Sequence, residues 1–198
     1  MFCTGWHAQR NANRTMSGFA KLRTTFDANC TTVLVGWKGL GALSPWPSHW
    51  AEFPPLLLGD EIARYADERS AASSDSMKLD LIAELLSLDL RTGNRQTIED
   101  VLSRLSALDR GDPRTELRKW RLVLLEELLE NLPEDPLYGL PASIEFWRRF
   151  GFPSDSPREV QGGGAALSPS ECYRQENLDR LLECHREWVE CEKRAIGR

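Results

Sequence analysis

The segment from Asp112 to Pro133, DPRTELRKWRLVLLEELLENLP, is the strongest helix signal in the chain. Asp112 is a typical N-cap, because its short carboxylate can accept hydrogen bonds from the free N–H groups of a first helical turn. Pro113 would occupy the first helical position, where a missing N–H costs nothing, and Pro133 would end the helix. The sequence therefore predicts a helix of about five turns near the middle of the chain.

The apolar residues of this helix cover about 200° of its circumference at 100° per residue. The set consists of Leu117, Trp120, Leu122, Leu124, Leu125, Leu128, Leu129 and Leu132. Such a wide arc predicts a helix that several neighbours pack against, and we expect Trp120, Leu124 and Leu128 to be nearly fully buried. Arg118 and Arg121 fall inside the same arc. Each guanidinium therefore either pairs with a carboxylate or carbonyl groups, or packs its stem and extends its head to water.

The rest of the chain predicts a mainly α fold: a single domain of antiparallel packed helices, arranged as stacked helical hairpins. Helical spacing of apolar residues, with N-cap signals before each run, appears after Asp60, after Ser74 or Asp75, and after Thr97. A short helix is expected from Ser143 to about Phe150. These segments belong to a helical core over residues 59–151, and their short connections favour antiparallel neighbours.

The core is flanked by less regular segments. Residues 1–16 are expected to form a disordered tail, 17–58 an irregular arm rich in Trp, Pro and Gly, and 152–168 a loop. A C-terminal helix is expected over 169–196. Within the arm, the β-branched run Thr31–Trp37 is the one plausible strand, although a short buried extended segment fits as well. The tryptophans of the arm either form an aromatic binding surface or anchor the arm to the body; they are Trp37, Trp46 and Trp50.

The sequence offers little that resembles catalytic or metal-binding chemistry. Cys184, His185 and Cys191 form the only cluster that resembles metal ligands, but Cys184 and His185 point about 100° apart on a helix, and a structural zinc site usually needs four ligands. Neither a nucleophile elbow nor a phosphate-binding loop is present. We therefore expect no catalytic residue, no cofactor and no bound metal. A pair of carboxylates for acid–base chemistry stays open, because spatial pairing is invisible in sequence.

Charge and composition favour a protein partner. The net charge of −5 divides into +3 for residues 1–58 and −8 for the remainder, and an acidic body argues against nucleic acid as a ligand. An acidic surface is compatible with binding a basic protein. The acidic residues could equally serve only to keep the protein soluble. Residues Glu126 and Glu130 form one stripe of the central helix, with Glu116 and Glu127 beside it. We expect this stripe to be the partner-binding surface if no neighbouring helix covers it.

The expected location is the cytoplasm. The five cysteines contain no CxxC pair, which indicates free thiols in a reducing compartment. The sequence shows neither an apolar run of about 20 residues, as a membrane-spanning helix requires, nor a secretory signal.

Three short motifs resemble a known family. They are RKW (Arg118–Trp120), FWRRFGFPSD (Phe146–Asp155), and GWKGLGALS (Gly36–Ser44) ahead of EIARYA (Glu61–Ala66). Over residues 31–196 the chain is similar to an uncharacterised bacterial family, a domain of unknown function whose members resemble immunity-type proteins encoded beside toxins. The resemblance implies a bacterial cytosolic helical protein that binds another protein, and it supplies no catalytic residues.

We therefore expect a non-enzymatic, cytosolic protein-binding module, with an immunity-like inhibitor of a partner protein as its specific form. Two alternatives stay open. The chain could be a helical scaffold or oligomerisation protein, or an enzyme with an unrecognised carboxylate site.

Overall fold

The computed structural model describes residues 18–39, 56–157 and 173–197. Within these ranges the chain forms eight α-helices and no strand. In chain order they are α2 (Gly18–Thr25), α3 (Cys30–Lys38), α4 (Gly59–Ala72), α5 (Ser76–Ser87), α6 (Arg95–Asp109), α7 (Pro113–Glu130), α8 (Pro136–Arg149) and α10 (Gln175–Ile196). The predicted mainly α, single-domain fold is confirmed. None of the described helices has the length and apolar character needed to cross a membrane.

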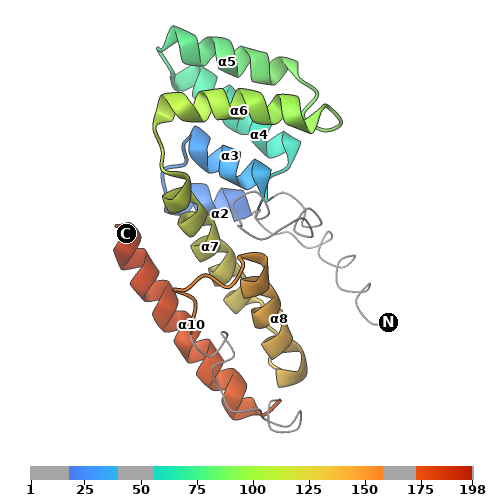
Figure 1. Cartoon of the computed structure of the whole chain (residues 1–198), viewed down its shortest axis with the longest axis vertical. Helices are drawn as coiled ribbons and strands as arrows, with labels where there is room; N and C mark the ends of the chain where they lie inside the picture. The colour runs from blue at the N-terminus through green and yellow to red at the C-terminus, as the bar shows by residue number, and fades with distance from the viewer. Residues whose placement is uncertain (1–17, 40–55, 158–172, 198) are drawn as a thin grey trace.

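The helices form two lobes that share α7 (Figure 1). We call α2–α6 the upper lobe, and the C-terminal half of α7 with α8 and α10 the lower lobe. In the upper lobe, α3 packs on α6 and α7, while α4, α5 and α6 follow one another as packed neighbours. In the lower lobe, α10 packs on both α7 and α8, and the last turns of α10 lie beside the first half of α7, where Glu192 bonds Arg118 (Figure 1).

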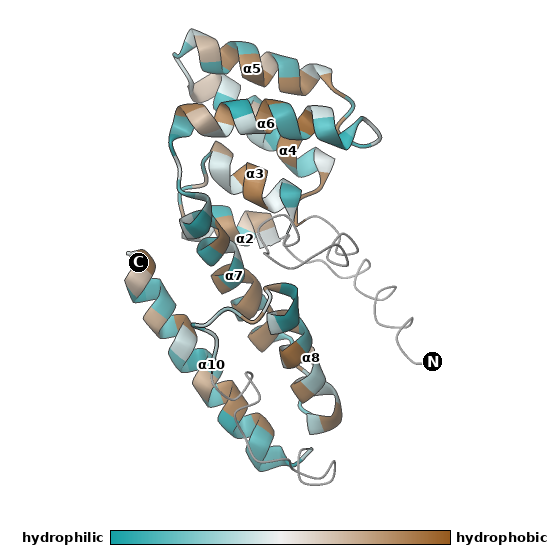
Figure 2. Ribbon diagram, in the orientation of Figure 1, coloured by the Kyte–Doolittle hydropathy of each residue, from teal (hydrophilic) through white to brown (hydrophobic). Residues whose placement is uncertain are grey.

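The wide apolar arc of the central helix α7 contributes residues to both hydrophobic cores. Trp120 and Val123 belong to the upper apolar cluster, whereas Leu122 and Leu125 belong to the lower one. All four are fully buried. Asp112 caps the helix as predicted, accepting hydrogen bonds from the backbone N–H groups of the first turn at 3.2 Å. In Figure 2 the hydrophobic stretches of α7 continue down into the lower lobe, between α8 and α10.

Two residues of this arc are less buried than predicted. Trp120 is completely buried, as expected, but Leu124 and Leu128 are only half-buried. Leu124 contacts both apolar clusters at the point where the lobes meet. The two lobes pack on different sides of α7, and a partly exposed seam runs between them. The residues at the centre of the apolar arc lie along this seam and are therefore not the most buried ones.

The predicted strand at Thr31–Trp37 is wrong, because this run lies in helix α3. Asn29 starts the helix with a capping box: its side-chain oxygen accepts the N–H of Thr32 at 2.9 Å, and the Thr32 hydroxyl accepts the N–H of Asn29 at 3.0 Å. Nearly the whole helix is buried against α6 and α7. Tertiary packing of this kind overrides the weak β preference of Thr and Val. Trp37 is buried here, while Trp46 and Trp50 lie outside the described residues.

Three helix starts also differ from the prediction. Asn94, not Thr97, caps α6. Helix α8 begins at Pro136 behind the N-cap Asp135 and contains Pro141 in its interior, so the expected linker before Ser143 is helical. The structure begins α10 at Gln175, and the predicted start near residue 169, like most of the predicted loop, lies outside the described residues.

Candidate functional site

Two of the glutamates predicted to bind a partner are largely covered. Glu116 is buried, with 3% of its surface exposed. Its Oε1 accepts a hydrogen bond from Lys119 Nζ at 2.8 Å, and its Oε2 accepts one from the Thr32 hydroxyl at 2.5 Å. Glu127 is half-buried. Glu116 therefore serves the packing of α7 against α3 and presents no charge to solvent.

The other two glutamates of the stripe are paired with lysines from neighbouring helices. Glu126 lies 2.9 Å from Lys193 Nζ of α10, and its side chain is 16% exposed. Glu130 is the only exposed member of the four, and its Oε1 accepts a hydrogen bond from Lys21 Nζ of α2 at 2.7 Å. The stripe consequently carries little uncompensated negative charge. Its role in partner binding stays a prediction, with Glu130 as its accessible residue.

The arginines inside the apolar arc form an ion-pair network that links α7, α10 and the segment after α8. Arg121, whose side chain is 7% exposed, donates to both carboxylate oxygens of Asp155 at 3.1 and 2.5 Å. Its Nη2 also lies 3.5 Å from Glu192. Arg118 donates two hydrogen bonds to Glu192 at 2.8 and 2.9 Å. Carboxylate pairing, the first of the two predicted alternatives, is therefore what the structure shows for both arginines.

Aromatic rings complete the surroundings of Arg121. Its guanidinium lies 4.9 Å from the ring centre of Trp188 and 5.8 Å from that of Trp147, and the Trp188 Nε1–H donates to the Asp155 carbonyl at 2.6 Å. Cation–π contacts of this kind gain strength when water is excluded. Sequence reasoning missed Asp155, which lies 34 residues from Arg121, because a pairing over that distance leaves no local signal.

His185 is part of the core and has both ring nitrogens engaged. It is fully buried. Its Nε2 accepts a hydrogen bond from the Trp147 indole at 2.7 Å, since an indole N–H can only donate. Nδ1 therefore carries the proton and donates to the Leu181 carbonyl at 2.6 Å. The Ser143 hydroxyl lies 3.0 Å from Nε2 as well. Within the described ranges, no group of three or more His, Cys, Asp or Glu residues is placed to hold a metal ion.

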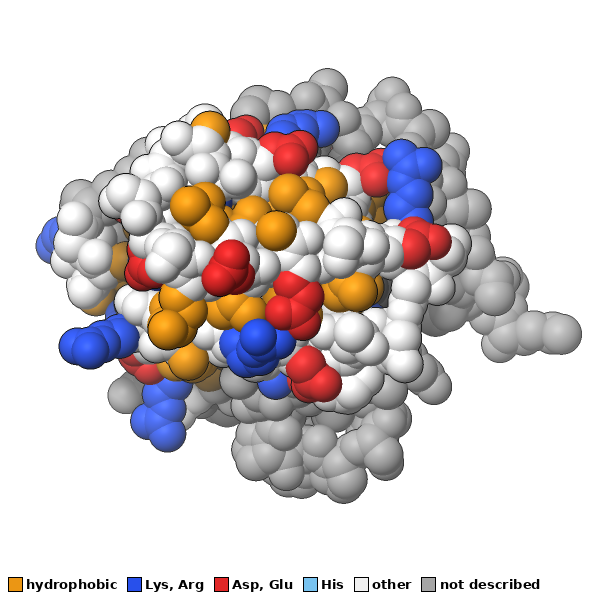
Figure 3. All heavy atoms as spheres, turned by 90° about the horizontal axis from the view of Figure 1, so that it is seen from above, with side chains coloured by type: hydrophobic (Ala, Val, Ile, Leu, Met, Phe, Trp, Pro, Cys, Tyr) orange, Lys and Arg blue, Asp and Glu red, His pale blue; other side chains and the backbone are white. Residues whose placement is uncertain are grey.

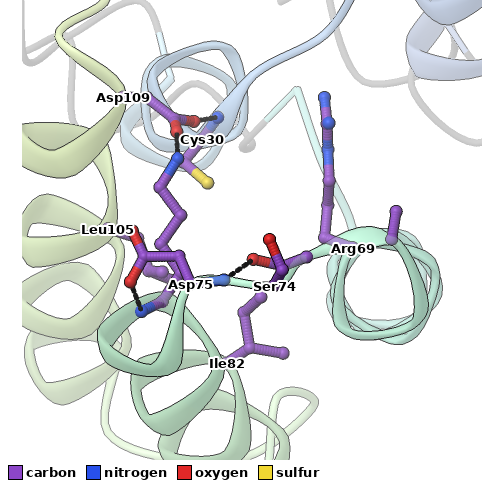
Figure 4. A pocket seen from close by; sticks show the side chains of 10 residues that line it. Cys30, Arg69, Ser74, Asp75, Ile82, Leu105 and Asp109 are labelled. Atoms are coloured by element: carbon purple, nitrogen blue, oxygen red, sulfur yellow. Dashed lines mark hydrogen bonds and ion pairs between the residues drawn. The ribbon is translucent and has the colours of Figure 1, made fainter.

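A shallow pocket of about 300 Å³ lies in the upper lobe at the junction of α3, α4, α5 and α6 (Figure 4). Asp109 organises its polar side: its carboxylate accepts the backbone N–H of Cys30 at 2.7 Å and lies 2.6 Å from Lys78 Nζ. Across the pocket, Arg69 donates to the carbonyl of Ala28. The charged groups of the pocket thus already have partners within the fold.

Burial and hydrogen bonding shift the pKa values of two groups in this pocket. Burial, reinforced by Asp109, raises the pKa of the Cys30 thiol to about 12, so the thiol stays protonated and is a poor nucleophile. Burial opposes ionisation of Asp109, yet the hydrogen bonds from Lys78 and Cys30 hold the pKa of its carboxyl below the usual value. Asp75, the other carboxylate here, caps α5 through the N–H groups of residues 77 and 78. Each of these polar groups therefore has a structural partner within the fold.

Uncompensated acidic charge is concentrated at the upper end of the molecule. Residues 56–112 hold twelve Asp and Glu against seven Lys and Arg, a net charge of −5, of which Arg23 and Lys38 from α2 and α3 offset two charges by pairing with Glu68 and Glu99. Several of these acids are paired, such as Asp60 with Arg91 and Glu84 with Arg104. Asp67 of α4 and Asp80 of α5 are exposed, and neither forms an ion pair with another described residue.

This acidic end also exposes large apolar side chains. Met77 and Leu86 of α5 are 61% and 36% exposed. Figure 3, which looks onto this end, shows acidic side chains lying among bands of hydrophobic ones. Apolar side chains surrounded by charge are typical of a protein-interaction surface. We call the exposed residues Asp67, Met77, Asp80 and Leu86 the acidic end.

Comparison with known proteins gives one match. The model of a family described as "Uncharacterized protein conserved in bacteria (DUF2247)" matches residues 22–193, which is most of the chain. Neither the curated proteins nor the solved structures contain a significant match. The motifs that carry the resemblance lie within the matched range, and the chain belongs to this family of uncharacterised bacterial proteins.

Proposed function

We propose that this protein is a non-enzymatic protein-binding module whose acidic end docks on a basic surface of another protein. The observation that carries the proposal is the presence, on one pair of packed helices, of two exposed carboxylates without ion pairs to other described residues, Asp67 and Asp80, and of exposed apolar side chains on α5, Met77 and Leu86. Complementary charge steers a basic partner to this end and excludes acidic ones, while the apolar side chains supply area that loses water on contact.

The rigidity of the α4–α5 hairpin supports this assignment. The Glu61 carboxylate accepts the Leu58 N–H at 2.8 Å at the start of α4, and Asp75 caps α5 at 3.0 and 3.3 Å. At the start of each helix, at least one backbone donor therefore has a side-chain acceptor. A surface that is ordered before binding loses little conformational entropy on association. A preformed acidic surface is what an immunity-like inhibitor needs, and we propose that role as the specific form of the function.

Affinity capture from a bacterial host lysate tests the proposal. The full-length chain should retain a basic protein, and Asp67→Lys combined with Asp80→Lys should lose it. The matched control is Glu176→Lys with Glu183→Lys, which makes the same charge change at exposed sites of α10. Capture of the partner should weaken as salt rises, since exposed charge pairs are screened. Retention of the partner by the first variant, or equal loss in both variants, would contradict the proposal.

A further inference from the structure

The outer side of α8 carries an apolar row that the fold does not use. Leu137, Tyr138 and Ile144 are 51%, 57% and 47% exposed, and Pro141 between them is exposed as well. At 100° per residue, Leu137, Pro141 and Ile144 lie within about 60° of one another on the helix. We call these four residues the α8 stripe.

The inner side of α8 accounts for its attachment to the molecule. Ser143, Phe146 and Trp147 are buried there, and the helix packs on α10. Pro141 removes a helical hydrogen bond, at a cost of about 3 kcal/mol in a helix interior. Because its ring is exposed, the core gains nothing from it. An exposed apolar row of this kind marks a contact with another molecule.

Charge is distributed unevenly along the stripe. Glu134 and Asp135 precede its first residue, and both are exposed. Arg148 and Arg149 follow its last residue, and the Arg148 side chain, which also reaches Glu145, is 56% exposed. Glu145 pairs with both arginines and offsets one of their charges, so the stripe runs from a net charge of −2 at its start to +1 at its end. When two copies of such a helix pair in antiparallel orientation, the acidic end of each lies next to the basic end of the other.

We propose that the α8 stripe binds the α8 stripe of a second copy of this chain, antiparallel, about a two-fold axis at Pro141. In that register, residues equally far from position 141 on either side lie at the same level along the paired helices. Ile144 then lies level with Tyr138 of the second copy, and Arg148 lies level with its Glu134. Two-fold symmetry makes each of these contacts twice.

The expected dimer is weak and reversible. Helix α8 has 14 residues, a length of about 21 Å. A single pair of such helices buries less than the ~1,200 Å² of a standard interface. The dimer should therefore form only as the protein concentration rises. This pairing lies at the opposite end of the molecule from the acidic end (Figure 1), so it neither needs nor excludes the proposed partner.

Sedimentation velocity of the full chain over a concentration series tests the apolar contact. The wild type should pass from monomer to dimer as concentration rises, and Ile144→Asp should stay monomeric. Met77→Asp is the matched control, because it places the same charge on an exposed apolar side chain of α5; it should dimerise like the wild type. A wild type that stays monomeric throughout, or a dimer that survives Ile144→Asp, would overturn the proposal.

Charge reversal tests the register independently of the apolar contact. Glu134→Arg and Arg148→Glu should each weaken the dimer, because each places like charges opposite one another. An equimolar mixture of the two variants should restore association, since both pairs are then attractive in the mixed dimer. Circular dichroism checks that each variant is folded. No recovery in the mixture would rule out the antiparallel register at Pro141.

Discussion

The two lobes are stabilised by different kinds of contact. Among the described residues, the apolar cluster of the upper lobe contains 22 buried residues, two of them from α7, and the cluster of the lower lobe contains only seven. The lower core compensates with directional contacts: Arg121, Glu192 and His185 are all buried there and bonded to named partners. A small core can thus fix a long helix such as α10 when ion pairs and hydrogen bonds specify its position.

This difference predicts which substitutions each lobe tolerates. An apolar core loses stability in proportion to the cavity that a truncation leaves. A core with buried charges loses more when one partner is removed, because the remaining charge is left without compensation. The lower lobe should therefore be the more sensitive to changes of single polar residues, and the upper lobe to changes of size.

The largest effect should come from Arg121→Met. The substitution keeps an apolar stem but removes the charge-assisted bonds to Asp155, one partner of Glu192 and the contacts of the guanidinium with two tryptophan rings, at a combined cost on the order of 3–5 kcal/mol. Urea-induced unfolding gives the change in free energy. Arg104→Met is the control, because Arg104 and its partner Glu84 are both exposed and the loss of their ion pair should cost clearly less. Equal costs for the two variants would count against a buried network centred on Arg121.

A smaller effect should follow truncation of the upper core. Leu102 is 1% exposed, so Leu102→Ala should lower the free energy of unfolding by roughly 2–5 kcal/mol. Leu124 lies half-buried at the seam between the lobes. Leu124→Ala should therefore cost less than about 2 kcal/mol, because the truncation leaves a smaller cavity. Urea unfolding of both variants measures the difference. If Leu124→Ala lowered the free energy of unfolding more than Leu102→Ala, Leu124 would lie inside a core and not at the seam between the lobes.

The smallest effect should come from Asp109→Asn. This carboxylate accepts hydrogen bonds from Lys78 and the Cys30 N–H, and its pKa is lower in the fold than the ~3.9 of an unfolded aspartate. It therefore stabilises the protein above that pH, and the contribution is lost as pH falls through the folded value. We expect a loss on the order of 1–2 kcal/mol at pH 7.

The pH profile distinguishes this cause from simple misfolding. The stability difference between the wild type and Asp109→Asn should narrow as pH falls below about 4, because the carboxyl takes up its proton first in the unfolded chain and then, at lower pH, in the folded protein. Thermal unfolding at a series of pH values measures it. A difference that is constant from pH 3 to pH 7 would mean that the ionised form of Asp109 contributes nothing.

Local signals in the sequence were sufficient for helices with clear periodicity and caps. The cap at Asp112 and the helical class of the chain are examples. The run Thr31–Trp37 misled because its stability comes from burial against α6 and α7, which no local pattern encodes. The start of α8 was missed because Gly139 and Pro141 are residues that usually break helices. The structure shows a packing reason for the glycine: a Cβ at position 139 would lie 2.7 Å from the Pro133 carbonyl oxygen and 3.0 Å from the Leu178 side chain.

The candidate surface was harder to predict than the fold. Helical periodicity placed four glutamates on α7, but whether a carboxylate is free depends on cations from distant segments. Lys21 and Lys193 lie 109 and 67 positions from their partners, Glu130 and Glu126. Asp67 and Asp80 show no distinctive local pattern, and they stand out only once the ion pairs of the fold are known.

The central claim is that the acidic end, and not the α7 stripe, binds the partner. Isothermal titration of the captured partner against three full-length chains tests it: the wild type, Asp67→Lys with Asp80→Lys, and Glu126→Gln with Glu130→Gln. We predict that affinity falls by about tenfold or more in the first variant and stays near the wild-type value in the second. Unchanged affinity in the first variant, with loss in the second, would contradict the account and place the interface on α7.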